Sequence, residues 1–203
     1  MTAGQKEEGV KTYTITVFTE NQIGLLNRIS IIFSRRQVSI ESINSSPTET
    51  KNIFRFGIVV NENLDMVIKL VRQIEKQVEV LKAYYHTDEE IIWQELALYK
   101  IPTSVVTERI SVERLLREYG ARAVVIRQDY TIFEATGHRE DTEKLIELLS
   151  PYGLIEFVRS ARVAIAKQST GIHEKIIELE NENPNKVSNA VHINESEFPS
   201  FSL

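Results

Sequence analysis

The segment from Glu20 to Arg28, Glu-Asn-Gln-Ile-Gly-Leu-Leu-Asn-Arg, combines residue types that could bind a small anion. It follows an alternating apolar stretch and precedes apolar residues at helical spacing, which predicts a strand that turns through Gly24 into a helix. The first N–H groups of a helix have no partner within the helix and lie at the positive end of its dipole. Such an end binds carboxylates or phosphates, and a glycine lets the backbone come close to the ligand. This loop is therefore the candidate binding site.

Two interpretations of the loop stay open on local evidence. In the structural one, Asn21 caps the helix and Gly24 only eases the chain into it. In the functional one, the backbone N–H groups from Ile23 to Leu26 receive a ligand carboxylate, and the Asn21 side chain holds an ammonium or carboxylate edge. A zwitterionic amino acid suits the functional arrangement, in which each charge-assisted hydrogen bond contributes roughly 1.5–3 kcal/mol.

Outside this loop, the side chains that usually perform catalysis are scattered. The histidines have no metal-ligand spacing, there are no cysteines, and the glycine motifs that bind nucleoside phosphates or dinucleotides are missing. The acidic residues at helical spacing indicate solvent-exposed helix faces. We predict no catalytic residue, no metal site and no cofactor on this chain.

Composition narrows the possible classes further. A hydrophobic share of 42% in 203 residues allows one or two domains with real cores. From Gln168 to Leu203 there are two lysines and six glutamates, a net of −4, and the other 22 basic and 23 acidic residues leave the body near −1. A nearly neutral body gives no support to nucleic-acid binding. No membrane span or secretory signal is visible, and the absence of cysteine fits a reducing compartment, so we expect a cytoplasmic protein with no membrane partner.

Both halves of the chain predict the same order of elements, β-α-β-β-α-β, and thus a four-stranded antiparallel sheet with two helices on one face in each half. The first half predicts strands at 11–19, 38–45, 53–61 and 78–86, with helices at 24–36 and 64–74. The second half predicts strands at 93–101, 123–126, 130–135 and 156–167, with helices at 111–119 and near 145–149. We expect domains at 11–87 and 92–167. Residues 168–203 indicate a flexible acidic tail.

The residues from Tyr13 to Arg36, followed by Val-Ser-Ile-Glu-Ser-Ile, resemble the ACT domain of the acetolactate synthase (acetohydroxyacid synthase) small-subunit family. The family's opening pattern is an Asn-x-x-Gly-x-Leu-x-Arg turn and helix, then a phenylalanine, a basic residue and an Ile-Glu-Ser strand. In this chain the pattern falls on Asn21, Gly24, Leu26, Arg28, Phe33, Arg35 or Arg36, Ile40, Glu41 and Ser42. The second half is similar to the family's ferredoxin-like C-terminal domain. The resemblance covers about 11–167 and implies an α+β fold of two tandem ferredoxin-like βαββαβ domains.

This resemblance also implies a function. Family members are non-catalytic regulatory subunits that raise the activity of a catalytic large subunit and confer feedback inhibition by a branched-chain amino acid, commonly valine. Thiamine diphosphate, Mg²⁺ and FAD would belong to that large subunit alone. Two ACT domains would pair as a homodimer, so that the helix-entry loop of one protomer faces the second strand of the other. The effector contacts expected on this basis are Asn21, Gln22, Ile23, Gly24, Leu25 and Leu26 from one protomer, with Ser39 and Ile40 from its partner.

One part of the pattern departs from the family. Where Gly-x-Asn-Ile-Glu-Ser is common, this chain has Gln37-Val38-Ser39-Ile40-Glu41-Ser42, so Ser39 replaces an asparagine. A serine is shorter and offers one hydroxyl in place of an amide, which predicts a weaker or water-bridged contact with the effector ammonium. Two other functions remain as alternatives. One is a free-standing ACT-domain amino-acid sensor without an enzyme partner, and the other is a small ferredoxin-like enzyme, which the missing catalytic residues disfavour.

Overall fold

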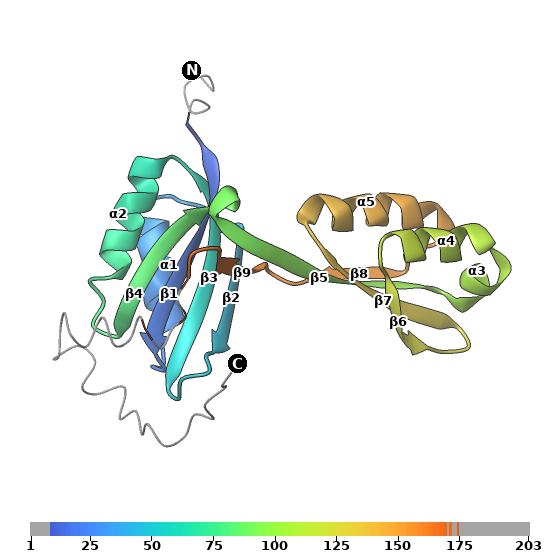
Figure 1. Ribbon diagram of the computed structural model, residues 1–203, viewed down its shortest axis with the longest axis horizontal. Helices are drawn as coiled ribbons and strands as arrows, with labels where there is room; N and C mark the ends of the chain where they lie inside the picture. The colour runs from blue at the N-terminus through green and yellow to red at the C-terminus, as the bar shows by residue number, and fades with distance from the viewer. Residues whose placement is uncertain (1–8, 170, 172–173, 175–203) are drawn as a thin grey trace. The chain divides into compact units, whose positions relative to one another are not determined.

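The computed structural model describes residues 9–169, 171 and 174, and the chain divides into two compact units (Figure 1). The chain passes into unit 2 between Glu90 and Ile91, just after the single turn η1 (Asp88–Glu90), and returns to unit 1 after Ile165. Most of the predicted tail, 168–203, lies outside the described residues, so its flexibility stays a prediction. No helix in the described part of the chain is long and apolar enough to cross a membrane.

Unit 1 is a four-stranded antiparallel sheet in the order β2-β3-β1-β4, packed against two helices. Strand β1 alternates, so that Tyr13, Ile15 and Val17 point to the helix side, and Ile15 lies directly opposite Ile58 of β3. This alternation places the apolar core on the helix face, and Thr14 and Thr16 on the opposite face of β1 are buried as well. The elements are β1 (Lys11–Glu20), α1 (Leu25–Arg35), β2 (Ser42–Pro47), β3 (Ile53–Glu62), α2 (Leu64–Ile74) and β4 (Val80–Thr87).

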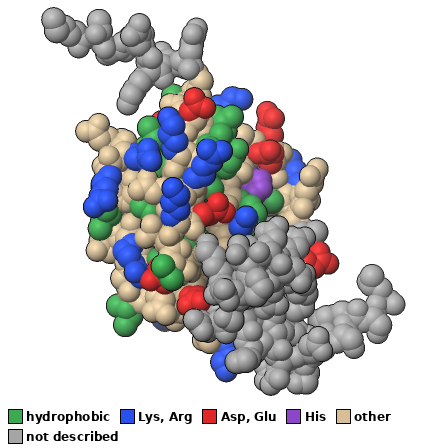
Figure 2. All heavy atoms as spheres, turned by 90° about the vertical axis from the view of Figure 1, so that its left-hand side faces the viewer, with side chains coloured by type: hydrophobic (Ala, Val, Ile, Leu, Met, Phe, Trp, Pro, Cys, Tyr) green, Lys and Arg blue, Asp and Glu red, His purple; other side chains and the backbone are tan. Residues whose placement is uncertain are grey.

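Helix α2 shows why these helices form and which face they bury. The Asn63 side chain accepts a hydrogen bond of 2.9 Å from the Met66 N–H, which caps the helix, and Asp65 lies in the first turn. One face of the helix packs on the sheet through Val67, Leu70, Val71 and Ile74. Figure 2 looks onto the α2 side of unit 1, where Lys and Arg side chains gather on the surface. Helix α2 carries exposed Lys69 and Arg72, three positions apart, and exposed Lys76 lies in the turn that follows the helix.

Unit 2 has the sheet order β6-β7-β5-β8, with β9 also paired to β5, and its three helices lie on one side of the sheet (Figure 1). Its core lies between sheet and helices, where Tyr99 and Ile101 of β5 meet Val112, Leu116 and Leu145. The elements are β5 (Ile91–Pro102), α3 (Thr103–Glu108), α4 (Ile110–Glu118), β6 (Arg122–Ile126), β7 (Tyr130–Gly137), α5 (Arg139–Leu149), η2 (Ser150–Tyr152), β8 (Glu156–Arg159) and β9 (Val163–Ala166). The α+β class with two ferredoxin-like units is confirmed.

The predicted strand at 38–45 is wrong at its start, because β2 begins only at Ser42. After α1 the chain turns through Gln37, whose φ is 56°, and the N–H of Val38 bonds to the Phe33 carbonyl at 3.1 Å. This hydrogen bond at the end of α1 places Val38 in the core beside the helix, where Val38 is 7% exposed. Its apolar character therefore reflects packing against the helix rather than membership of a strand.

Two further differences lie in unit 2. Helix α3 was not predicted, because its short sequence has weak periodicity; it begins directly after Pro102, which ends β5. The predicted closing strand at 156–167 is two strands, β8 and β9. Between them the chain departs from regular pairing at Ser160, whose N–H donates to the Leu96 carbonyl and whose hydroxyl accepts from the Leu96 N–H. Such local irregularity in one strand is the behaviour of a β-bulge.

Candidate functional site

The N-terminus of α1 is open in the way that the sequence predicts for an anion site. Gly24 is the N-cap residue with φ 82° and ψ 0°, no side chain caps the helix, and no acidic residue lies in its first turn. Helix α2 is capped by Asn63, and before α5 the Asp141 carboxylate accepts from the His138 N–H at 3.3 Å, whereas α3 and α4, like α1, have no side-chain cap. The Leu25 N–H donates to the Gln22 carbonyl at 3.4 Å, and no side chain accepts from the other N–H groups of the first turn, which with the positive dipole end of α1 are available for a negatively charged ligand.

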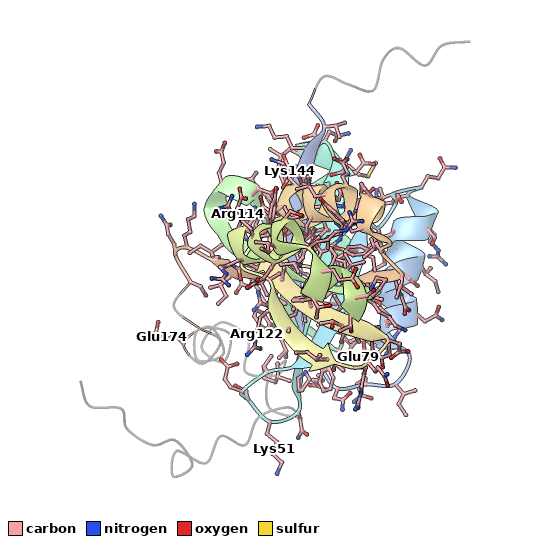
Figure 3. All side chains as sticks on the ribbon, turned by 90° about the vertical axis from the view of Figure 1, so that its right-hand side faces the viewer. Lys51, Glu79, Arg114, Arg122, Lys144 and Glu174 are labelled. Atoms are coloured by element: carbon pink, nitrogen blue, oxygen red, sulfur yellow. The ribbon has the colours of Figure 1, made fainter. Side chains whose placement is uncertain are left out.

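The structural interpretation of Asn21 is wrong, because Asn21 does not cap the helix. Its backbone N–H donates to the Asn52 carbonyl at 3.0 Å, which ties the loop to the turn between β2 and β3. Lys51 lies in that turn and its side chain points outward (Figure 3). The loop is therefore held by backbone contacts, and the Asn21 side chain makes none of the hydrogen bonds of a helix cap.

Glycine is favoured at position 24 because of its backbone conformation, and not because neighbouring atoms leave no room for a side chain. A Cβ atom built on Gly24 would meet no atom within 4 Å, yet φ 82° lies in the region that L-residues rarely adopt. A left-handed residue costs roughly 1–2 kcal/mol for side chains other than glycine, asparagine and aspartate. The open space above Gly24 is where a ligand would approach the helix end.

A cleft of about 180 Å³ lies beside this helix end. At roughly 30 Å³ for each water molecule it holds about six, which is room for a small metabolite and less than the roughly 300 Å³ at which pockets for drug-sized ligands begin. The cleft is lined by Thr19, Glu20, Asn21, Gln22, Gly24, Leu25, Leu26, Ser45, Phe54 and Phe56.

The predicted site residues separate into two groups. Asn21, Gln22, Gly24, Leu25 and Leu26 line the cleft. Three others do not line it: Ile23, Ser39 and Ile40. The first of these is fully exposed, at 102%, and the other two lie in the segment before β2. Ser39 and Ile40 were expected from a second protomer, so their absence from the cleft of a single chain leaves that prediction untested.

The sheet side of the cleft was missed from sequence. Strand pairing sets Thr19 opposite Phe54, and Val17 and Ser45 opposite Phe56, which places these side chains on the helix side of the sheet. The alternation of Phe54 and Phe56 places both side chains on one face of their strand, but it does not indicate that this face lines a cleft. The signal that could have found them is their position near the start of β3, next to the end of β1 that leads into the loop.

Arg28, which belongs to the family pattern, does not line the cleft. Its Nη1 lies 2.7 Å from Oε1 of Glu79, labelled in Figure 3, and the two side chains are 43% and 18% exposed. A pair this exposed contributes about 0–1 kcal/mol. Its effect is to attach the first turn of α1 to the residue that precedes β4.

The cleft offers binding chemistry. Its lining combines helix N–H groups, two side-chain amides, a carboxylate and hydroxyls with the apolar surfaces of Leu25, Phe54 and Phe56. Within the described ranges, no group of three or more His, Asp or Glu side chains could hold a metal ion. A small ligand with a carboxylate and an apolar side chain matches this combination.

Comparison with protein-family models first identifies the class of domain to which each unit is similar. Residues 15–82 match the family model of the AHAS small subunit-like ACT domain, so unit 1 is an ACT domain. Residues 94–168 match the family model of the small subunit of acetolactate synthase.

Comparison with individual related proteins then identifies the protein family of the whole chain. The acetolactate synthase small subunit of Bacillus subtilis is 36% identical over 154 residues, 75% of this chain and 89% of that protein. The corresponding protein of Mycolicibacterium smegmatis is 31% identical over 164 residues, 81% of this chain and 96% of that one. The crystal structure of the Thermotoga maritima small subunit has the same fold, with a TM-score of 0.71 and 23% identity over 79% of this chain and 99% of that chain. The chain belongs to the acetolactate synthase small-subunit family.

Proposed function

We propose that this regulatory subunit activates a thiamine-diphosphate-dependent catalytic subunit and makes it sensitive to inhibition by a branched-chain amino acid, with valine as the first candidate. The thiamine diphosphate, Mg²⁺ and FAD would all lie on the catalytic subunit. The observation that carries the proposal is the uncapped N-terminus of α1, which opens on a cleft with an apolar sheet side. Residues 11–87 would be the amino-acid-binding regulatory domain, and 92–167 a second ferredoxin-like domain.

The cleft supports a specific way of binding an amino acid. The ligand carboxylate would receive the N–H groups of Gly24 and Leu26, together with that of Leu25 in exchange for its 3.4 Å hydrogen bond to the Gln22 carbonyl. Each charge-assisted bond contributes roughly 1.5–3 kcal/mol. The ligand side chain would then pack on Phe54 and Phe56. A buried methylene contributes about 0.8 kcal/mol, so a branched aliphatic chain is favoured over alanine or glycine. Valine and isoleucine differ by one methylene, which limits their discrimination to about 1–3 kcal/mol.

A second protomer would complete the site. Strand β2 is an edge of the sheet, and an edge strand has unpaired backbone groups that can pair with another chain. Ser39 and Ile40 lie just before this strand, and Ile23 is fully exposed on the neighbouring loop. A homodimer formed along β2 would bring the partner's segment before β2 toward the cleft. Because Ser39 is shorter than asparagine, Ser39→Asn should lower the Kd for valine if this segment contacts the ligand.

Inhibition would follow from differential binding. A ligand that bridges two protomers favours the arrangement in which both halves of the site are in place. The catalytic subunit would respond to that arrangement with a coupling of about 1–3 kcal/mol. By reciprocity, the presence of the catalytic subunit must change the Kd for the effector by the same factor.

The direct test mixes the full chain with its catalytic subunit and measures acetolactate formation with and without valine. We expect the chain to raise the rate and valine to lower it, while the chain alone produces no acetolactate from pyruvate. A free-standing sensor would bind the amino acid but would neither co-purify with the catalytic subunit nor change its rate. Activation that no branched-chain amino acid reverses would contradict the effector part of the proposal.

A further inference from the structure

The strongest unexplained feature of the cleft is the side chain of Thr19. It is 0% exposed, and its hydroxyl oxygen has no hydrogen-bond partner within the described structure. The residue lines the cleft and is paired with Phe54, which places its side chain on the helix side of the sheet with the two phenylalanines. A polar atom is thus buried, without a partner, on the sheet side of the cleft.

Leaving a hydroxyl in this state destabilises the free protein. Buried polar groups are nearly always hydrogen-bonded, because an unpaired one loses its water without gaining a partner. A valine would fill almost the same volume without this cost, yet the chain has threonine. The hydroxyl is therefore better explained by a partner that arrives with a ligand than by the packing of the free protein.

We propose that the Thr19 hydroxyl contacts the bound amino acid directly and accepts a hydrogen bond from its ammonium group. This inference rests on the proposed function, because it concerns the same cleft. With the carboxylate on the N–H groups of α1, the ammonium is the remaining polar part of the ligand and needs acceptors. A hydroxyl oxygen has two lone pairs, so Thr19 would share the ammonium with the other acceptors that line the cleft, among them the Glu20 carboxylate and the Ser45 hydroxyl. Thr19 would thus select an α-amino acid over an acid of the same shape without the amino group.

The experiment measures binding to the full-length chain by titration calorimetry, with valine and with isovalerate, which keeps the carboxylate and branched chain but lacks the ammonium. Thr19→Val should raise the Kd for valine roughly tenfold, the loss of one hydrogen bond to a charged group. The Kd for isovalerate should change less than twofold. Thr19→Ser keeps the hydroxyl and should bind valine within about threefold of the unsubstituted chain.

Thr50 provides a matched control. Its hydroxyl is also buried without a partner, at 7% exposure, and the residue does not line the cleft. Thr50→Val and Thr19→Val should both raise the melting temperature of the ligand-free chain, because each removes an unpaired hydroxyl. Only Thr19→Val should weaken valine binding.

The outcomes separate this inference from the proposed function. If the unsubstituted chain binds neither valine nor isoleucine, the proposed effector fails. If it binds valine and Thr19→Val binds equally well, the role of Thr19 is refuted while the proposed function stands. An equal loss of valine and isovalerate binding would also refute the ammonium contact, because it would show a change of cleft shape instead.

Discussion

Gly24→Asp is the substitution that tests the anion site most directly, because the structure separates its effect on folding from its effect on binding. A side chain at this position meets no atom within 4 Å, so there is no clash. Aspartate is one of the few residues that adopts the left-handed conformation readily, and its charge favours a helix N-terminus by about 0.3–1 kcal/mol. We expect the free energy of unfolding to change by about 1 kcal/mol or less.

Binding should respond much more strongly. The new carboxylate would lie where the ligand carboxylate is proposed to lie, and two like charges about 4 Å apart repel by about 4 kcal/mol at an effective dielectric constant near 20. Gly24 is exposed, so solvent and salt weaken this repulsion. At least a tenfold increase in the Kd for valine should remain.

Gly24→Asn is the matched control for this test. Asparagine has the same size and tolerates the same backbone conformation, but it carries no charge. Calorimetry at two salt concentrations should show that Gly24→Asp binds valine at least tenfold more weakly than Gly24→Asn, with the gap narrowing as salt increases. In the mixed enzyme, the aspartate variant should still activate and no longer respond to valine. Equal binding by the two variants would show that no anion binds at the end of α1.

Three other substitutions test how the fold is held. Gln37→Gly should stabilise the chain by about 0.5–1 kcal/mol in urea unfolding, because Gln37 has φ 56°; no gain would mean that the left-handed turn is not strained. Arg159→Leu should cost about 3 kcal/mol, because Arg159 Nε lies 3.2 Å from Oε2 of the buried Glu95, and adding Glu95→Leu should recover part of the loss. Burial raises the pKa of Tyr99 to about 12, so its contribution to stability should be complete below about pH 10, the pKa in the unfolded chain, and lost as the pH rises toward 12. Tyr99→Phe should remove that pH dependence of the urea midpoint.

The sequence predicts the fold well where apolar residues alternate over a long strand or recur along a long helix. The strand at 53–61 and the helix at 64–74 agree closely with β3 and α2, because their patterns are sustained over nine residues or more. A glycine after an apolar helical pattern is typical of a helix end, and Gly120, with φ 62°, follows directly after Tyr119, the C-cap of α4. Local chemistry of this kind is visible without tertiary information.

The predictions from sequence fail where tertiary contacts determine the local structure. Val38 is apolar because it packs beside α1, so its hydrophobicity wrongly extended the predicted strand. The sheet side of the cleft depends on the register of β1, β2 and β3, which brings together residues more than thirty positions apart in the chain. An unpaired hydroxyl such as that of Thr19 cannot be recognised from sequence at all, since threonine is an ordinary residue for a strand.

Under the proposed function, the open end of α1 would couple the stability of the folded chain to effector binding. A helix without a cap leaves its first N–H groups unpaired, which destabilises its first turn. A ligand carboxylate would supply the missing acceptors, so binding would add the interaction that Asn63 gives to α2 within the chain. By mass action, an effector at a hundred times its Kd would stabilise the folded chain by about 2.7 kcal/mol. Because Arg28 ties the first turn of α1 to Glu79, this stabilisation would reach the start of β4. A capped α1 would be more stable alone and would have less to gain from the effector, so under the proposed function the missing cap would allow the ligand to change the state of the protein.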